Sequence, residues 1–352
     1  PAALAASAAS SASSAPLACT GAAPSGDMTA QRIDAANPTR SEPGLYEGPV
    51  WIKDALYFSD FTFGPGFPSR IQKLDANGKV STFIADSGSN GLAVDANGNI
   101  LAATHKFKSV SRYTPDGKRT DVVAKYNGNV FNSPNDMALA ADGTLYFSDP
   151  AFQRDAAPGG QDKTRVYRVA ADGEVTVVDD TLTNPNGVSL SPAGDVLYVN
   201  GMVGEKGVLR AYPIVGGKPQ QGRDLVNGLG IPDGMAVDCL GNVYVTEHTD
   251  KRLRVFTPQG KHIATIKVDA NVTNAAFGGA NPLEDILAEV IDFEALAAGP
   301  IRLFVTATNV RTGRGRVFRN DAITPQVLLA SACLPTLFQA IEIDGDGYWD
   351  RS

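Results

Sequence analysis

The stretch NGVSLSPAGDVLYV (residues 186–199) holds the pattern from which we infer the fold of the whole chain. It opens with a polar residue and a glycine, continues as an alternating apolar run, makes a tight turn and ends in a second apolar run. Apolar residues at every second position indicate a β-strand with one buried face. The stretch DGMAVDCLGNVYV (residues 233–245) repeats the pattern, and weaker or related copies open at Glu47, Asn90, Asn135 and Asn274.

The copies recur at a nearly constant interval. Their second residues stand at positions 48, 91, 136, 187, 234 and 275, so the interval is 41 to 51 residues. A period near 45 residues with several strands per unit is typical of β-propeller blades. We therefore predict an all-β fold in the form of a six-bladed propeller. The inner strands of the six blades would run along one central channel. The six opening residues are then expected to line the mouth of that channel: Glu47, Asn90, Asn135, Asn186, Asp233 and Asn274.

Composition excludes several classes of partner. The 352 residues carry a formal net charge of −7 and no run of basic residues, which argues against binding to nucleic acid. There is no run of 18 bulky apolar residues, so we expect no membrane span. The three cysteines, Cys19, Cys239 and Cys333, are far apart, and we predict no disulfide within the chain. The sequence does not indicate an oligomeric state.

The N-terminal part differs from the repeats. Residues 1–27 are rich in Ala and Ser and are predicted to be the remnant of an export signal or a flexible linker. Export would make the protein periplasmic or secreted, and the alternative is a cytoplasmic location. A strand near Gln31–Asp34 is expected to complete the last blade and close the ring.

The C-terminal part changes texture after Asn281. Residues 282–296 have apolar side chains at helical spacing and predict a helix. A strand over Ile301–Thr306, a helix opened by Thr324 and Pro325, and a strand over Phe338–Ile343 are expected to follow. We predict a propeller domain over 28–281, with an incomplete last blade, and an α/β fragment over 282–352. The fragment could fill the empty strand positions or pack beside an open ring, and the second arrangement is favoured because no hairpin turn leads back.

The opening residues have the chemistry of a cation site. Converging carboxylate and amide oxygens suit a hard divalent cation. The alternative is that Asn-Gly and Asp-Gly pairs only form turns. Each repeat, however, has a separate turn pair elsewhere, such as Asn97-Gly98 or Asp142-Gly143.

Five motifs in register resemble one family. They are EGPVW (47–51), SPND (133–136), LYFSDP (145–150), NPNG (184–187) and IPDGM (231–235). Over residues 44–280 the chain resembles the gluconolactonase, senescence marker protein (regucalcin) and luciferin-regenerating enzyme family. That resemblance implies a six-bladed propeller that hydrolyses a sugar lactone with one divalent metal ion in its channel. Calcium is the ion expected first, with magnesium, manganese or zinc as alternatives.

The resemblance also assigns roles to residues. It implies that Glu47, Asn186 and Asp233 are metal ligands and that Asp233 is also the general base. Asn135 would contact the substrate or a metal-bound water. Asn90 and His105 are further substrate-binding candidates, although His105 could equally be a packing residue. Animal members carry Arg two residues before the matched Asn, where this chain has Ser133, so the substrate contacts of that branch do not transfer.

The C-terminal part is similar to a second family. FVTATNVRTGR (304–314), ASACLPTLF (330–338) and DGDGYWD (344–350) resemble the C-terminal part of patatin-like phospholipases. Asp350 matches the Asp of their Ser–Asp dyad, but no G-x-S-x-G nucleophile motif is present. We therefore predict a catalytically inactive fragment. The alternatives to a lactone hydrolase are a non-catalytic metal-binding propeller and a patatin-like lipid acyl hydrolase.

Overall fold

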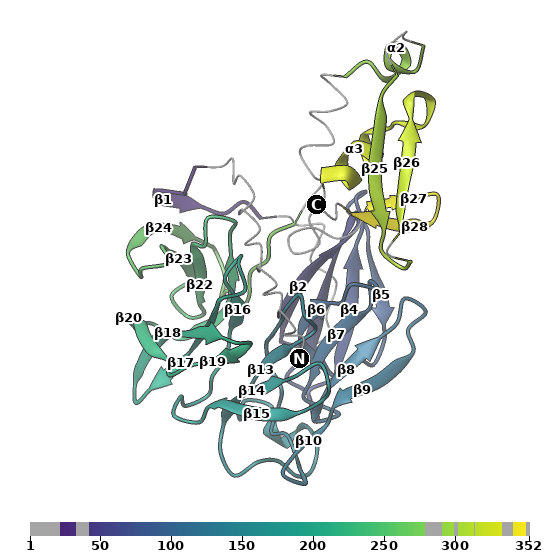
Figure 1. Ribbon diagram of the computed structural model, residues 1–352. Coiled ribbons are helices and arrows are strands. Elements are labelled where there is room, and N and C mark those ends of the chain that lie inside the picture. Colours follow the sequence, from purple (N-terminus) through teal and green to yellow (C-terminus); the bar gives the residue numbers. More distant parts are fainter. Residues whose placement is uncertain are drawn as a thin grey trace, which may run out of the picture.

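The computed structural model describes residues 22–32, 42–278, 291–298, 302–312, 314–332 and 341–349. From Gly44 to Lys267 the chain forms five successive antiparallel sheets, numbered here from sheet one to sheet five (Figure 1). Within each sheet the strands follow one another in chain order from the innermost strand outward, apart from the short strand β19, as the predicted repeats require. This confirms the mainly β architecture and the strand pairs predicted for the first five copies.

Sheet one contains β2 (Gly44–Ile52), β3 (Ala55–Thr62), β4 (Ser69–Leu74) and β5 (Val80–Ile84). Sheet two contains β6 (Ser89–Val94), β7 (Ile100–Thr104), β8 (Ser109–Tyr113) and β9 (Arg119–Val123). Sheet three contains β12 (Met137–Leu139), β13 (Leu145–Asp149), β14 (Arg165–Val169) and β15 (Val175–Asp179). Sheet four contains β16 (Val188–Leu190), β17 (Val196–Val203), β18 (Lys206–Val215), β19 (Lys218–Pro219) and β20 (Arg223–Leu229). Sheet five contains β21 (Pro232–Val237), β22 (Val243–Glu247), β23 (Arg252–Phe256) and β24 (His262–Lys267). A hairpin of β10 (Lys125–Tyr126) and β11 (Asn129–Val130) precedes sheet three, and the short helix η2 (Arg154–Ala156) follows β13.

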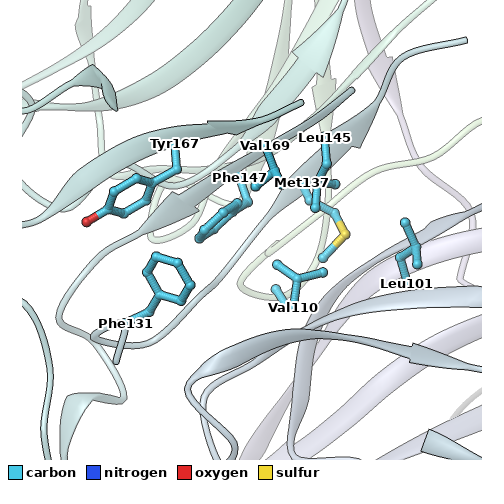
Figure 2. Close-up of a cluster of buried hydrophobic side chains, with 9 residues drawn as sticks. Leu101, Val110, Phe131, Met137, Leu145, Phe147, Tyr167 and Val169 are labelled. Atoms are coloured by element: carbon cyan, nitrogen blue, oxygen red, sulfur yellow. The ribbon is translucent and has the colours of Figure 1, made fainter. Parts of the chain in front are cut away.

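The hydrophobic core lies between neighbouring sheets. In Figure 2, Met137 and Phe147 of sheet three face Leu101 and Val110 of sheet two, and all four side chains are buried. Fully burying one such side chain contributes about 1.5–3 kcal/mol. The innermost strands β2, β6, β12, β16 and β21 contact one another in that order. Packing between sheets therefore fixes the innermost strands, and with them the opening residues of the repeats.

The N-terminal strand is not where the sequence predicted it. β1 (Gly26–Thr29) pairs in parallel with β24 and adds a fifth, outermost strand to sheet five. The expected strand near Gln31–Asp34 would instead have completed a sixth blade, and this prediction is wrong for Gln31, while Asp34 lies outside the described residues. The physical reason is that the outer edge of β24 offers unpaired backbone groups, which a parallel strand can satisfy.

The sixth copy contributes one extended segment. Residues 272–278 were expected to include an inner strand over Val272–Phe277, but no strand is assigned there. The segment still bonds to both neighbouring sheets: Gly234 N–H donates to the Thr273 carbonyl at 2.6 Å, and the Thr273 hydroxyl donates to the Tyr46 carbonyl. It therefore links sheet five to sheet one.

The C-terminal part forms its own sheet, in the order β26-β25-β28-β27 (yellow in Figure 1). Buried Val305, Phe318, Val327 and Tyr348 form a core between this sheet and helix α3. The described strands therefore pair with one another and do not fill the places missing from a sixth blade. The elements are α2 (Phe293–Ala298), β25 (Phe304–Asn309), β26 (Gly315–Arg319), η3 (Asn320–Ala322), α3 (Pro325–Ala332), β27 (Ile341–Ile343) and β28 (Asp346–Trp349).

The predictions for this part are confirmed in outline. The helix opened by Thr324 and Pro325 is α3, and the two expected strands appear as β25 and β27, although residues 301 and 338–340 of the predicted strands lie outside the described residues. The first part of the helix expected over 282–296 lies outside the described residues, and α2 begins at Phe293. Strands β26 and β28 were not predicted, because their charged and glycine-rich sequences lack the alternation of a half-buried strand.

Two further findings concern the whole chain. Within the part of the chain that the structure describes, no helix has the length and apolar character needed to cross a membrane. Cys239 is disulfide-bonded, so the prediction of no disulfide is wrong. The other two cysteines, Cys19 and Cys333, lie outside the described residues. Separation along the sequence was therefore a poor guide to disulfide bonding here.

Candidate active site

Three of the opening pairs are β-bulges at the start of the innermost strands. The register of β2 with β3 shifts between Glu47 and Val50, that of β6 with β7 between Ser89 and Leu92, and that of β21 with β22 between Pro232 and Met235. Each shift falls on an opening pair. A bulge redirects the side chain that precedes the regular strand. The repeated polar residue thus sits at a deliberate break in pairing.

In three of the pairs the glycine is required for a different reason from a hairpin glycine. Gly91, Gly187 and Gly234 do not have positive φ, so the turn interpretation does not hold for them. A Cβ on Gly91 would lie 2.4 Å from the Asn135 carbonyl oxygen, and one on Gly234 would lie 2.1 Å from Cγ of Asn274. Glycine is required because the next copy approaches too closely for a side chain.

These approaches link successive copies in order. Gly91 N–H donates to the Asn135 carbonyl at 2.6 Å, and Gly187 N–H donates to the Asp233 carbonyl at 2.9 Å. The Asn274 amide donates to Glu47 Oε2 at 3.4 Å, which joins the last copy to the first. Residues that are up to 227 positions apart in sequence are thereby brought to one end of the innermost strands.

Asp233 has a partner on each carboxylate oxygen. Asn186 Nδ2–H donates to Asp233 Oδ1 at 2.7 Å, and His248 Nδ1 lies 3.2 Å from Asp233 Oδ2. Burial raises the pKa of Asp233, while His248 and Asn186 partly offset that rise. The structure therefore brings together two of the three predicted metal ligands in direct contact.

Glu47 is the third of the predicted metal ligands. It is buried, and burial raises its pKa well above the ordinary range, with the negative charges of Asp233 and Asp136 adding to the rise. A charge effect of this kind requires the carboxylates to be near neighbours. Glu47, Asp136 and Asp233 thus form a group of buried acids around the opening residues.

Asp136 and Asn274 are site residues that the sequence predictions did not assign a role. Asp136 accepts hydrogen bonds from the backbone of Met137 at 2.9 Å and of Val188 at 3.3 Å, and burial raises its pKa to about 7. Asn274 donates to Glu47. The available signal was Asp136 itself, a carboxylate at the position where the other strong copies carry glycine.

His248 was also missed, although its counterpart was chosen. Ser89 pairs with Thr104 in sheet two, and Pro232 pairs with Glu247 in sheet five, so His105 and His248 occupy equivalent positions. Only His248 contacts Asp233. His105 is fully buried, and its Nε2 lies 2.8 Å from the carbonyl oxygen of Phe67. The sequence could not separate the two histidines because both directly follow a second strand.

The two predicted asparagines lie at the same end of the strands. Asn90 is buried, and its side-chain oxygen has no hydrogen-bond partner among the residues the structure describes. Asn135 is buried and supplies its backbone carbonyl to Gly91. An unsatisfied buried carbonyl oxygen costs free energy unless a ligand or water completes it. Asn90 therefore has the capacity to accept one further hydrogen bond.

A cavity of about 500 Å³ continues from the opening residues along the innermost strands. Gly48, Asp136 and Asn274 line it, together with small and apolar residues of the innermost strands such as Ala138, Leu190 and Met235. Of the three acids Asp136 lines this cavity, and of the six opening residues Asn274 does so.

The donor set fits a hard divalent cation. Three buried carboxyl groups with raised pKa values repel one another, and a cation would offset that repulsion. Among the described residues, no three His, Cys, Asp or Glu side chains are grouped closely enough to hold a metal ion by themselves. A ligand set here would have to include an amide oxygen, and Asn186, whose Nδ2 is already used by Asp233, has its Oδ1 on the same amide group.

Comparison with known proteins identifies relatives of matching extent. The chain is 29% identical over 266 residues to a gluconolactonase of Zymomonas mobilis, covering 66% of this chain and 72% of that protein. It is 26% identical over 245 residues to a pentonolactonase of Haloferax volcanii, covering 67% of this chain and 78% of that protein.

Solved structures agree on the fold. A gluconolactonase of Xanthomonas campestris superposes with a TM-score of 0.60 and 28% identity, covering 67% of this chain and 80% of that one. A calcium-binding regucalcin of Agrobacterium tumefaciens superposes with a TM-score of 0.58 at 21% identity, which bears on the fold alone, and covers 73% of this chain and 84% of that one. The model of the SMP-30/gluconolactonase/LRE-like region matches residues 45–284, and the chain belongs to that family.

Proposed function

We propose that this chain hydrolyses a sugar lactone to the corresponding hydroxy acid, with Asp233 as the general base. The observation that carries the proposal is the buried Asp233 carboxylate, contacted by Asn186 and His248 and close enough to Glu47 to raise its pKa. The relatives named gluconolactonase and pentonolactonase support a lactone hydrolase, since each match covers about two thirds of this chain.

The proposal includes one divalent cation, with calcium expected ahead of magnesium, manganese or zinc. Glu47, Asn186 and Asp233 would hold it, and the mutual repulsion of the buried acids supports this assignment. When bound, such a cation polarises a carbonyl group and makes bound water more acidic.

The residues of the chain then have separate tasks. Asp233 accepts the proton of the attacking water as general base. The water oxygen bonds to the lactone carbonyl carbon, the ring C–O bond breaks, and Asp233 returns the proton to the ring oxygen, which leaves as the hydroxyl group of the product. Asn90 would accept a hydrogen bond from a substrate hydroxyl through its unsatisfied oxygen, and Asn135 would orient the substrate. His105 would act indirectly, by holding the carbonyl of Phe67.

Substitution of Asp233 tests the assignment. Asp233→Asn keeps the shape but removes charge and basicity, and we expect it to lose nearly all hydrolysis of D-glucono-1,5-lactone above the spontaneous rate, measured in a pH-stat. Asn135→Ala should reduce turnover less, because it removes an orienting group only. Asp172→Asn, at an exposed turn of sheet three, is the matched control. Wild-type turnover in a folded Asp233→Asn protein would refute the role.

The alternative is a non-catalytic propeller that binds a metal ion. The raised pKa values of the buried acids are compatible with it, because they suit a cation site with or without catalysis. The two functions separate in one titration. A lactone hydrolase should lose turnover with chelator and regain it with calcium. A scaffold should bind calcium, seen by calorimetry, without hydrolysing any lactone.

We further propose six positions around the channel. The five sheets supply five, and the segment 272–278 would take the sixth inner-strand position. The contacts of Asn274 with Glu47 and of Thr273 with Tyr46 support this count.

Export to the periplasm or the medium is a separate proposal. It is supported by the Ala- and Ser-rich residues 1–27 and by the disulfide at Cys239, because disulfides persist mainly in oxidising compartments. One disulfide among three cysteines leaves one thiol. Titration of the unfolded, unreduced protein should therefore find one thiol per chain, and three thiols would remove this support.

The origin of the C-terminal part in a patatin-like fragment also stays a proposal. It rests on the motifs at 304–314 and 344–350, and Asp350 lies outside the described residues. The family match ends at residue 284, before α2 begins. We expect no hydrolysis of acyl esters such as p-nitrophenyl butyrate by the lipase mechanism, because the nucleophile motif is missing from the sequence.

A further inference from the structure

Large apolar side chains are exposed at the same end of the sheets as the buried acids. Each innermost strand is antiparallel to its neighbour, so the second strand ends beside the opening residue, as the pairing of Glu47 with Ser59 shows. The loops after the second strands are therefore on the side of the site. The exposed apolar residues here are Phe63 and Phe152 on these loops, Val203 at the end of β17, and Ile231 just before β21.

The loop that carries Phe152 is held in place by buried contacts. The Ser133 hydroxyl donates to the Pro150 carbonyl at 2.7 Å, and the backbone N–H of Gln153 donates to the same hydroxyl at 3.4 Å. Asp149 accepts the backbone N–H of Ser133 at 2.8 Å. Phe152 is nevertheless 45% exposed. Its ring is thus presented to solvent by a fixed loop.

The loop that carries Phe63 follows β3 of sheet one and lies at the same end of the sheets. His105 Nε2 lies 2.8 Å from the carbonyl oxygen of Phe67, which fixes the loop from beneath. A Cβ on Gly66 would lie 3.9 Å from the carbonyl oxygen of Ala156, so the two loops approach each other there. Phe63 is 55% exposed. The two phenyl rings are therefore carried by neighbouring loops.

We propose that these side chains form an apolar rim that binds an alkyl or aryl substituent on the lactone ring. This inference rests on the proposed function and names the substrate class of the same site. When a ligand covers an apolar ring that a rigid loop holds in water, the burial of apolar surface favours binding. Because the loops are already fixed, little ordering cost opposes that gain. A ring held at Asp233 would direct its substituent out of the site, toward the loops.

The test compares two lactones with the same six-membered ring. δ-Decalactone carries a pentyl chain that δ-valerolactone lacks. For the wild-type protein we expect kcat/KM to be roughly tenfold higher for δ-decalactone, the size expected for partial burial of an alkyl chain. The double variant Phe63→Ser/Phe152→Ser should lower that ratio by about tenfold, chiefly through KM. Val215→Ser, at the exposed last residue of β18, should leave the ratio unchanged.

Each outcome has a distinct meaning. Hydrolysis of D-glucono-1,5-lactone and δ-valerolactone with no gain from the pentyl chain overturns the apolar rim and leaves the proposed function standing. Hydrolysis of no lactone overturns both. A gain that survives in the double variant also overturns the rim. Sedimentation of both proteins provides a last check: a dimer lost in the double variant, with an unchanged ratio, would assign the rings to contact between copies instead.

Discussion

The His105 side chain is enclosed so completely that protonating it opposes folding. Its ring lies between those of Phe61 and Phe67, with centroids 5.7 Å and 6.2 Å away. With Nε2–H donating to the Phe67 carbonyl, Nδ1 is the unprotonated atom, and it has no partner within the described part of the chain. Burial lowers the pKa of His105 to about 4.

This shift predicts an acid-sensitive stability. A histidine whose folded pKa lies below the unfolded value of about 6.5 binds fewer protons when folded, so its contribution is complete above pH 6.5 and is lost as the pH falls toward 4. Between pH 7 and pH 5 the loss should be about 2 kcal/mol. Urea unfolding of the wild type and of His105→Gln at both values measures it. The variant should lose less stability than the wild type on acidification, and equal losses would contradict the placement of His105.

The glycines of the opening pairs provide a second prediction at this scale. A Cβ on Gly187 would lie 2.6 Å from both the Asp233 carbonyl oxygen and Asn200 Nδ2. Gly187→Ala should therefore cost about 2–3 kcal/mol of unfolding free energy, since backbone must move. Gly194→Ala is the control: it has φ of +69° and no atom within 4 Å of the added Cβ, so it should cost only the backbone term, about 1 kcal/mol. Equal costs would show that crowding at Gly187 is absent.

Among the elements, the paired strands were the most predictable from sequence. Hairpin turns such as those at Gly98 and Gly143 have the positive φ that Asn-Gly and Asp-Gly pairs favour. The bulges were not predictable, because a bulge depends on how the next copy packs. The contact of His248 with Asp233 was missed for the same reason: it depends on the position of a side chain relative to a bulge.

The segment 272–278 shows where a sequence pattern fails as a guide to secondary structure. Its apolar alternation predicted a strand, but no following strand pairs with it in the described residues, and no strand is assigned. Its order comes from other contacts, including the Thr246 hydroxyl bond to the Thr273 carbonyl at 2.8 Å and the edge-to-face contact of Tyr244 with Phe277. The site therefore depends on an element without a sheet of its own.

Loss of one hydroxyl should expose that dependence. Thr273→Val keeps the shape but removes the hydrogen bond to the Tyr46 carbonyl, the link from sheet five to sheet one. We expect a loss of about 1 kcal/mol in stability and weaker binding of calcium, because Asn274 and Glu47 are adjacent to the broken link. Thr265→Val, on the outer strand β24, is the control. Calcium affinity equal to the wild type in Thr273→Val would show that the link does not support the site.

At the scale of the molecule, two units of different construction share one chain. The sheets from β2 to β24 bury their faces against one another, whereas β25 pairs with β26 and β28 and packs against α3. The sequence predicts a boundary near residue 281, where period two changes to helical spacing. It could not show that the C-terminal strands would pair among themselves, because pairing partners are set by packing rather than by local pattern.

The difference in construction predicts a difference in exchange rates. A unit of about 50 residues buries a small fraction of its surface and is marginally stable by itself. Amides of β25 and α3 should therefore exchange through local opening, at rates well above those of β7 and β13, whose residues are buried between sheets. Hydrogen exchange followed by mass spectrometry measures both regions in one experiment, with strand β23 of sheet five as an internal reference. If β25 exchanged as slowly as β7 and β13, the C-terminal unit would unfold only with the sheets, and it would then have to be regarded as part of their cooperative structure.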